Sequence, residues 1–265
     1  MKILISSYTG LGNFILKTPL INAIDKEYDS SQIDLIFGFP WGAENVLRDS
    51  ELINKEYWLP PQYSIQKKIN MFKFLRQQNY DIVMLPFDSS PNFILLLSVL
   101  FLNRSQMISH YSNHSLSIKT RLIKICIRLF LLKVIWVPVP NGRHEIKLNL
   151  DLLHAVNNNL SPDHQTFINW KSENISGFNL PELYLVIQPL AANGGPTPKT
   201  WSPENFDKLI DEFLLKFPKM KVVLVGDAGD AGDVSKLKTF KMLSNSNVIN
   251  LLSKTTFNQL CNVLS

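Results

Sequence analysis

The chain opens with a strand-like run, a glycine turn and a helix-like stretch, and this order constrains its fold most strongly. Residues Lys2–Ser7 are largely apolar, and the sequence Tyr-Thr-Gly-Leu-Gly follows at positions 8–12. Over residues 13–28 the apolar side chains recur close to helical spacing. A strand, a glycine turn and a helix open a βαβ unit, which predicts a parallel sheet.

The glycine pair Gly10 and Gly12 is a candidate ligand site. Glycines between a strand and a helix let a ligand approach the backbone, and the helix N-terminus favours an anion. The turn is not a dinucleotide fingerprint, because Ile15 stands where GxGxxG has its third glycine. A tight turn without a ligand explains the same residues.

Strand-like and helix-like segments continue to alternate through the first half of the chain. Strands are predicted at Gln32–Phe37 and Asp81–Leu85, and helices around 64–77, 91–101 and 117–132. The alternation predicts an α/β fold with a doubly wound parallel sheet.

A polar stretch divides the chain into two parts. A predicted helix over residues 144–155 closes the first half, and an asparagine run that begins at Asn157 breaks the pattern. We therefore predict an N-terminal domain over residues 1–157, a linker over 158–181 and a C-terminal domain over 182–265.

The second half repeats the α/β pattern over a shorter length. Strands are predicted at 183–188, 221–226 and 248–251. Ser202 as N-cap and Pro203 as first helical residue open the helix between the first two. Three short strands are few for an open α/β sheet, so the C-terminal domain is expected to be incomplete.

Composition favours a globular protein of the cytoplasm. Apolar residues make up 45% and charged residues 18% of the 265 positions, and the two cysteines belong to no CxxC or Cys/His cluster. Neither a zinc site nor a disulfide framework is indicated. The N-terminus lacks the apolar region of a signal peptide, and the longest apolar run, Phe93–Leu102, is shorter than the ~20 residues that span a bilayer.

Basic charge is concentrated in the first half of the chain. The net charge is +5, and the segment from Ser89 to His144 contains no acidic residue, a field that attracts anionic partners. Within it, residues 120–137 predict a basic amphipathic helix with Arg121 and Lys124 on one face. Such a helix suits an anionic membrane or a lipid-linked acceptor. A core helix with a solvated basic stripe is the alternative.

Two loops that follow strands of the second half are candidate binding sites. The first, over residues 188–202, offers the Thr197 hydroxyl and the Lys199 ammonium just before a helix N-terminus, which suits a diphosphate. The second begins at Gly226 and contains Asp230, whose carboxylate suits ribose hydroxyls. A solvated lysine and a plain turn are the alternatives.

The histidines indicate no catalytic or metal-binding motif. His110 and His114 are expected in a polar loop, and helix capping is the expected role of His144. The chain has no GxSxG and no GxxxxGK[ST] sequence, which argues against hydrolases and P-loop NTPases.

These segments, in this order, resemble the heptosyltransferase family, glycosyltransferase family 9. The match runs through GLGNFILKTPL at 10–20, HE and LDLL within 144–153, KTWSPENF at 199–206, VLVG at 223–226 and VINL at 248–251. No single motif is diagnostic, whereas the ordered set is fairly specific.

The resemblance implies a GT-B fold, with an acceptor-binding N-terminal and a donor-binding C-terminal Rossmann-like domain. It implies metal-independent, inverting transfer of a sugar, typically heptose, from an ADP-linked donor to a bacterial lipopolysaccharide core. No cofactor and no nucleic acid are implied, and the anionic glycolipid acceptor brings the protein to the cytoplasmic face of the inner membrane. The acceptor is expected near Gly10–Asn13, Arg121 and Lys124, and the donor diphosphate near Lys199, whose charge stabilises the leaving group.

Two features depart from the family pattern. Family members have an aspartate, the proposed general base, where this chain has Asn13, and an amide cannot take a proton at neutral pH. Asp88 is an alternative base; otherwise Asn13 only orients the acceptor, or activity is lost. The sequence also ends at Ser265, before the family's Asp-[Ser/Thr]-Gly-Pro-x-His type loop. A non-catalytic GT-B binding protein is therefore the competing hypothesis, and a dinucleotide-dependent oxidoreductase is a third.

Overall fold

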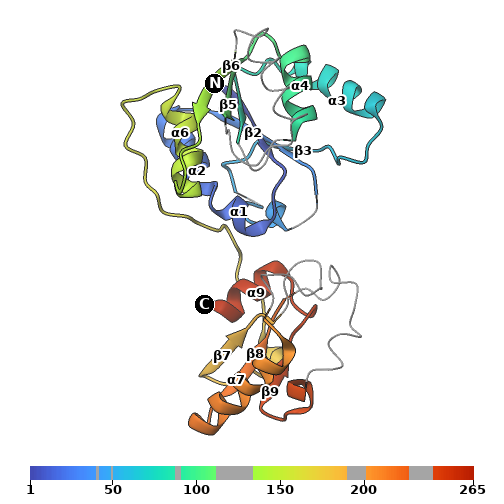
Figure 1. Cartoon of the computed structure of the whole chain (residues 1–265), viewed down its shortest axis with the longest axis vertical. Coiled ribbons are helices and arrows are strands. Elements are labelled where there is room, and N and C mark those ends of the chain that lie inside the picture. Colours follow the sequence, from blue (N-terminus) through green and yellow to red (C-terminus); the bar gives the residue numbers. More distant parts are fainter. Residues whose placement is uncertain (40–41, 49, 87–90, 112–133, 190–200, 227–240) are drawn as a thin grey trace. The chain divides into compact units, whose positions relative to one another are not determined.

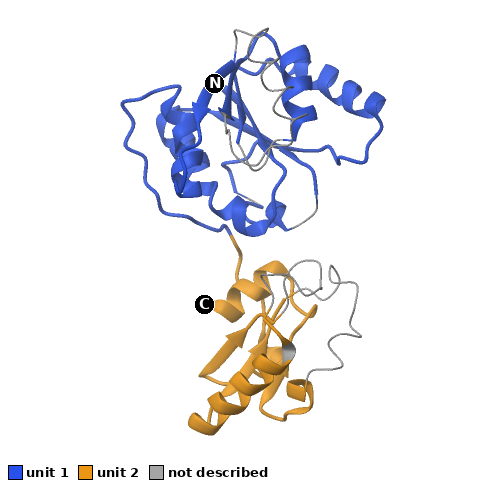
Figure 2. Ribbon diagram, in the orientation of Figure 1, with its two compact units in different colours: residues 1–169 blue, residues 170–265 orange. Residues whose placement is uncertain are grey.

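The chain forms two compact units, Met1–Asn169 and Trp170–Ser265 (Figure 2). The structure, a computed structural model, describes residues 1–39, 42–48, 50–86, 91–111, 134–189, 201–226 and 241–265. Each unit has its own parallel β-sheet with helices on both faces (Figure 1).

Unit 1 is built on a sheet of parallel strands in the order β3-β2-β1-β4-β5-β6. The strands are β1 (Lys2–Ser7), β2 (Gln32–Phe37), β3 (Lys55–Trp58), β4 (Ile82–Leu85), β5 (Gln106–Tyr111) and β6 (Val134–Pro138). This is the order of the Rossmann fold. The chain runs outward from β1 to β3 and then returns to the other side of β1, so the strand order reverses between β1 and β4.

Burial explains which strands the sequence predicted. The side chains of β1, β2 and β4 are almost all buried, as expected for central strands covered on both faces. Strands β3, β5 and β6 were not predicted. Residues 134–137 belong to β6, so the helix expected over 120–137 is wrong at that end. His110 is likewise a buried residue of β5 and not part of a polar loop.

Helices cover both faces of the unit 1 sheet. They are α1 (Leu11–Ile15), α2 (Thr18–Glu27), α3 (Ile65–Gln77), α4 (Asn92–Phe101) and α6 (Glu145–His154), with a short 3-10 helix η1 (Ala43–Asn45). Figure 1 shows α2 and α6 on one side of the sheet and α3 and α4 on the other. The Ser64 hydroxyl caps α3 by accepting from Lys67 N at 3.3 Å, and His144 Nδ1 caps α6 by accepting from Ile146 N at 3.3 Å. Capping was the predicted role of His144.

The helix expected over residues 13–28 is two helices, α1 and α2. The Thr18 hydroxyl donates to the Ile15 carbonyl at 2.8 Å, and Pro19 follows in the first turn of α2. Proline has no N–H and fits only the first turn of a helix, so it starts α2 as a new helix.

A buried carboxyl group, that of Asp34, connects residues at the amino ends of several strands of the sheet. Asp34 accepts hydrogen bonds from the Tyr80 hydroxyl at 2.5 Å and from Asn54 Nδ2 at 2.7 Å, and the Lys2 ammonium lies 4.0 Å away. Burial raises the pKa of Tyr80, which therefore stays a proton donor. These bonds satisfy a buried polar side chain at the amino ends of the strands, opposite the ligand-binding edge of such folds, so their role is structural.

The segment after α6 is held to unit 1 as far as Asn169. Phe167 N donates to the Thr18 hydroxyl at 3.0 Å, and Asn169 N donates to the Val46 carbonyl at 2.8 Å. From Glu173 onward the chain bonds to unit 2, where the carboxylate of Glu173 accepts from the Thr256 hydroxyl at 2.6 Å. The division between the units thus falls inside the stretch 158–181.

Unit 2 has a sheet of parallel strands in the order β7-β8-β9 within the described residues. Its elements are η2 (Ser176–Phe178), β7 (Tyr184–Ile187), α7 (Pro203–Lys216), β8 (Lys221–Leu224), η3 (Lys241–Ser244), β9 (Val248–Asn250) and α9 (Phe257–Leu264). One face of the sheet packs on α7 through Ile210, and the other packs on α9 through Val263. Both faces are therefore covered, as in larger doubly wound sheets.

Candidate functional site

The turn that follows β1 lies where ligands bind in folds of this type. In open α/β sheets the binding crevice is at the carboxyl ends of the strands, where the strand order reverses. In unit 1 that place lies between β1 and β4. Gly10, Gly12 and Asn13 follow β1 directly, so the structure brings these three predicted residues together at that edge.

Neither glycine of this turn is required by the fold of the described residues. Gly10 has an extended backbone, with φ −79° and ψ 175°, which any residue adopts. A methyl group added at Gly10 or Gly12 would meet no described atom within 4 Å. The absence of side chains leaves open space on this turn, and Gly12 and Asn13 are both exposed.

Aromatic packing fixes the direction in which the turn faces. Phe14 is the buried residue of α1, and its ring lies 5.6 Å from that of Phe37 at the end of β2. The Phe37 ring stacks in turn on Trp58 at 5.4 Å. Because Phe14 is held inside, its helical neighbours Gly12 and Asn13 face outward.

A second aromatic cluster supports the turn from the other side. Tyr8 is buried, and its hydroxyl donates a short hydrogen bond to the Leu59 carbonyl. Burial raises the pKa of Tyr8, so the hydroxyl stays protonated. A methyl group added at Gly38 would lie 2.0 Å from the Tyr8 ring, so only glycine fits at the end of β2.

Lys17 is a residue that sequence reasoning missed. Its side chain is fully buried, and its ammonium lies 3.4 Å from the Ser6 carbonyl and 3.5 Å from the Ser7 hydroxyl at the end of β1. A buried ammonium needs polar partners, and here the end of β1 supplies them. The only signal in the sequence is a lysine within an apolar run, between Leu16 and Thr18.

In unit 2, Gly226 lies at the carboxyl end of the sheet. Its φ is +128°, a conformation that side chains rarely adopt, and an added methyl group would lie 3.4 Å from Gln188 Cγ. The Gly226 carbonyl accepts from Ser253 N at 2.8 Å. The backbone conformation thus accounts for this glycine, and the contact with Gln188 does not add to the requirement. The exposed Gln188 beside it is a further polar group at the same edge.

Helix α7 begins directly after the segment that contains Lys199. Its N-cap is Ser202, as predicted, although no side-chain capping bond forms. Glu204 lies in the first turn, and hydrogen bonds from its own backbone N–H and from Ser202 lower its pKa. Trp201 is half exposed and meets the Phe206 ring edge-on at 5.3 Å, so it anchors the start of the helix.

The remaining candidate residues lie outside the described part of the chain. They are Asp88, Arg121, Lys124, Thr197, Lys199 and Asp230. Among the described residues, no group of three His, Cys, Asp or Glu side chains is placed to hold a metal ion.

Comparison with known proteins identifies the family. The family model for glycosyltransferase family 9 (heptosyltransferase) matches residues 69–265. The chain belongs to glycosyltransferase family 9. Both the family and the class of enzyme predicted from the sequence, a glycosyltransferase, are confirmed.

Solved structures of family 9 proteins have the same fold. ADP-heptose lipopolysaccharide heptosyltransferase II of E. coli matches with a TM-score of 0.64 at 18% identity, over 98% of this chain and 75% of that one. The family 9 glycosyltransferase of Veillonella parvula matches with a TM-score of 0.67 at 15% identity, over 98% and 72%. The E. coli heptosyltransferase WaaC with ADP-2-deoxy-2-fluoro heptose matches with a TM-score of 0.61 at 16% identity, over 100% and 80%.

These matches confirm the predicted GT-B type of α/β fold with parallel sheets. No curated protein matches the sequence. Among the described residues of this family 9 chain, no helix is both long and apolar enough to cross a bilayer.

Proposed function

We propose that the chain transfers heptose from ADP-heptose to the core of a bacterial lipopolysaccharide or a similar surface glycan. The observation that carries this proposal is the family 9 match over residues 69–265. Two solved structures of similar fold support the donor, because WaaC of E. coli was solved with ADP and with ADP-2-deoxy-2-fluoro heptose. The division of labour proposed is acceptor binding by residues 1–157 and donor binding by 182–265, joined by the linker 158–181.

The reaction proposed is an inverting displacement at the anomeric carbon. An acceptor hydroxyl oxygen forms a bond to that carbon as the bond to the diphosphate oxygen breaks. ADP leaves with the electron pair, and the hydroxyl proton passes to a base. A cation beside the departing diphosphate stabilises its growing negative charge, and we assign this role to Lys199, so the step requires no metal ion.

On the acceptor side, the open turn at Gly10–Asn13 supplies space and a polar amide. Because the two glycines have no side chains, a sugar ring can approach the backbone there. The Asn13 amide can donate hydrogen bonds to the sugar hydroxyls or accept them. Asn13 cannot act as the base, so we assign the proton to a carboxylate, with Asp88 as the candidate. Asp88 follows β4, the strand that pairs with β1 at the same edge.

Donor binding involves Lys199 with Thr197, Gly226 and Asp230 in this proposal. Anionic groups of the acceptor are attracted by the acid-free segment 89–144, including Arg121 and Lys124. A glycolipid acceptor places the reaction in the cytoplasm, at the inner face of the cytoplasmic membrane.

The experiment that tests this proposal is nucleotide-sugar binding to Lys199→Ala. Titration calorimetry with ADP-heptose should show binding weakened about tenfold or more, because a charge-assisted contact to phosphate is lost. Lys219→Ala, which removes an exposed lysine of the same unit, is the matched control and should bind as the unmodified chain does. An unchanged affinity of Lys199→Ala for ADP-heptose would contradict the assignment of Lys199 to donor binding.

A second candidate function is that of a non-catalytic binding protein with the GT-B fold. The observation that favours it is the amide of Asn13 at the position of the family base. In that case Asn13→Asp changes nothing in a transfer assay. Sugar transfer that appears only in the Asn13→Asp chain would instead identify a degraded enzyme.

A further inference from the structure

An open groove lies between the edge strand β3 and helix α3 in unit 1. Its volume is about 410 Å³, within the range of small-molecule sites. Tyr57 of β3 forms one wall, and Tyr63, just before α3, closes one end. It lies at the β3 edge of the sheet and not at the strand-order reversal between β1 and β4, and none of its lining residues belongs to the proposed acceptor turn.

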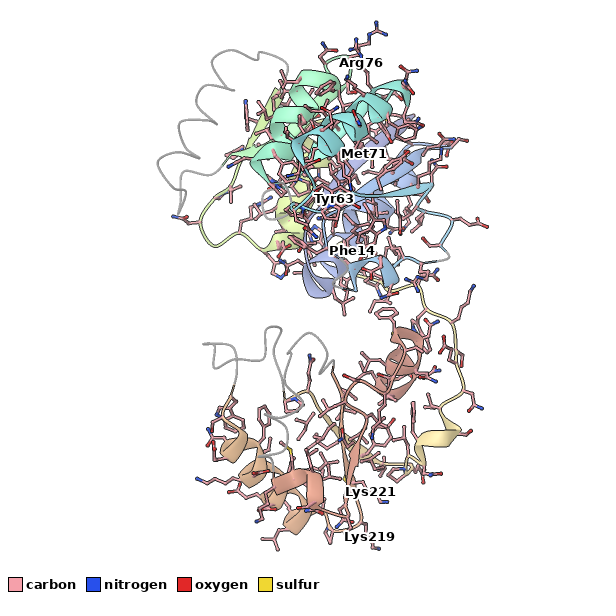
Figure 3. All side chains as sticks on the ribbon, turned by 90° about the vertical axis from the view of Figure 1, so that its right-hand side faces the viewer. Phe14, Tyr63, Met71, Arg76, Lys219 and Lys221 are labelled. Atoms are coloured by element: carbon pink, nitrogen blue, oxygen red, sulfur yellow. The ribbon has the colours of Figure 1, made fainter. Side chains whose placement is uncertain are left out.

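The other wall of the groove is a single stripe of α3. Asn70 and Met71 are three and four positions after Lys67, and Phe74 is four and three positions after them, so the four residues share one face of the helix. The core-facing side of α3 is different and carries the buried Phe72 and Leu75. Figure 3 labels Tyr63, Met71 and Arg76 one after another along this side of the unit.

Aromatic rings line the groove and are partly exposed. Phe74 is 45% exposed and meets the Tyr57 ring edge-on at 5.9 Å. Tyr63 is 38% exposed, and the Lys67 ammonium lies 5.0 Å from the centre of its ring. The Tyr57 hydroxyl donates to the buried Asp34 at 3.3 Å, so Tyr57 presents its ring and not its hydroxyl to the groove. Partly exposed aromatic rings are typical of surfaces that meet the membrane interface.

The segment that lines the groove carries no acidic residue, because residues 57–80 contain no aspartate or glutamate. Lys67 is the exposed cation on the groove-lining face of α3. Lys73 and Arg76 are exposed on other faces of the helix, and Lys68 donates to the Pro61 carbonyl at 2.6 Å. Exposed aromatic rings beside an exposed cation are complementary to an anionic lipid surface.

We propose that the α3–β3 groove docks on an anionic phospholipid bilayer. The rings of Tyr57, Tyr63 and Phe74 take up the apolar part of a lipid, and the Lys67 ammonium contacts the phosphate groups. This goes beyond sugar transfer, and only its link to a glycolipid acceptor rests on the proposed function.

The groove is joined to the acceptor turn by direct contacts. Leu59 lines the groove, and its carbonyl accepts the hydrogen bond of Tyr8, two residues before Gly10. The Tyr8 ring also meets the Phe93 ring edge-on at 5.7 Å, and the Lys68 ammonium lies over that same ring. Docking through this groove therefore brings the turn after β1 close to the membrane surface, where a lipid-linked acceptor is found.

The test is co-sedimentation of the full chain with vesicles. Vesicles of phosphatidylethanolamine with phosphatidylglycerol should bind the chain at least about tenfold more tightly than phosphatidylcholine vesicles. Lys67→Glu should weaken binding to the anionic vesicles about tenfold, and Phe74→Ser about fivefold. Added salt should weaken it further, because exposed charges are screened.

Matched controls come from unit 2. Lys219→Glu reverses an exposed lysine, and Leu215→Ser removes a side chain that is 85% exposed. Both should bind anionic vesicles as the unmodified chain does, and circular dichroism confirms that each variant is folded. Equal binding to neutral vesicles, no binding to anionic vesicles, or full binding by the two groove variants would each overturn the proposal.

Two further readouts separate this proposal from the proposed function. Calorimetry with ADP-heptose should give the same affinity in Lys67→Glu, Phe74→Ser and the unmodified chain. If the chain binds anionic vesicles through the groove but does not bind ADP-heptose, the docking surface stands and the donor assignment fails. Binding of lipid-free core oligosaccharide that is lost in Phe74→Ser would show a glycan in the groove and contradict the membrane assignment.

Discussion

The two units place glycines at the carboxyl ends of their strands for different physical reasons. In unit 2, Gly226 has φ +128°, a backbone conformation that demands a glycine, although an added methyl group would make only ordinary contacts with Gln188 and Leu252. In unit 1, Gly10 and Gly12 have room for a methyl group and no left-handed φ. The same residue type is structural in one turn and unexplained by the described structure in the other.

The difference separates a glycine that the fold requires from glycines that it does not require. A glycine that the fold does not need costs conformational entropy, and an alanine in its place would favour helix α1 by up to about 1 kcal/mol. Gly12 is in α1 and is nevertheless a glycine. We propose that space for a bound molecule accounts for it, which agrees with its place at the strand-order reversal.

The largest effect on stability is expected for Gly38→Ala. The added methyl group would lie 2.0 Å from the Tyr8 ring, which is itself held by Leu59, Phe39 and Phe93. We expect unfolding in urea to be destabilised by about 3 kcal/mol, the upper end for overpacking. A free energy of unfolding equal to that of the unmodified chain would show that the Tyr8 ring moves freely, contrary to the packing described here.

Gly226→Ala should destabilise unit 2 alone, by about 2 kcal/mol. The cost comes from the strained backbone at φ +128°. Hydrogen exchange should quicken in β8 and β9 and stay unchanged in β1 and β2. Because Gly226 is also a proposed donor contact, ADP-heptose binding is measured as well. A loss of binding without any change in exchange would show that the ligand, and not the backbone conformation, requires this glycine, and the contrast between the two turns would be lost.

Acid should loosen the edge of unit 2 that Glu173 holds. Hydrogen bonds from Thr256 and Asn258 lower the pKa of Glu173 below its usual 4.5. Because the pKa of Glu173 is lower in the folded than in the unfolded state, its carboxylate stabilises the folded state at pH values above the unfolded-state pKa. This stabilisation is lost as the pH falls through the folded-state pKa.

Glu173→Gln should therefore unfold at a lower urea concentration than the unmodified chain near neutral pH, and at the same concentration in acid. The expected effect is small, because the carboxylate of Glu173 is exposed. It concerns the unfolding of unit 2 and leaves that of unit 1 unchanged. Glu182→Gln, in the same unit, is the control. A difference that persists unchanged in acid would exclude the charge of Glu173 as its cause.

Which strands the sequence predicts depends on how deeply each strand is buried and on how distinct its residue pattern is. The central strands β1, β2 and β4 are predicted because each contains a short group of apolar residues such as Ile, Leu, Val and Phe. Strand β3 is Lys-Glu-Tyr-Trp at the sheet edge, half exposed and polar, and gives no such signal. Strand β6 continues an apolar run that also fits a helix, and a short run of this kind does not distinguish the two.

The candidate site was predictable only where a motif marks it. The turn at Gly10–Asn13 is such a motif, and the structure places it at the strand-order reversal. The buried ammonium of Lys17, the need for Gly38 under Tyr8 and the groove beside α3 depend on contacts between distant segments. Those contacts follow from the order of strands in the sheet, which local sequence patterns do not contain.

The measurement that tests the account most directly compares Gly12→Ala with Gly177→Ala. Both glycines have open space at the added methyl group, and Gly177 lies in η2, away from the strand ends. Both variants should melt within a few degrees of the unmodified chain. In transfer of heptose from ADP-heptose to lipopolysaccharide core, kcat/KM should fall about tenfold or more for Gly12→Ala alone, because the acceptor is displaced. Equal transfer by the two variants would contradict the role of this turn in acceptor binding.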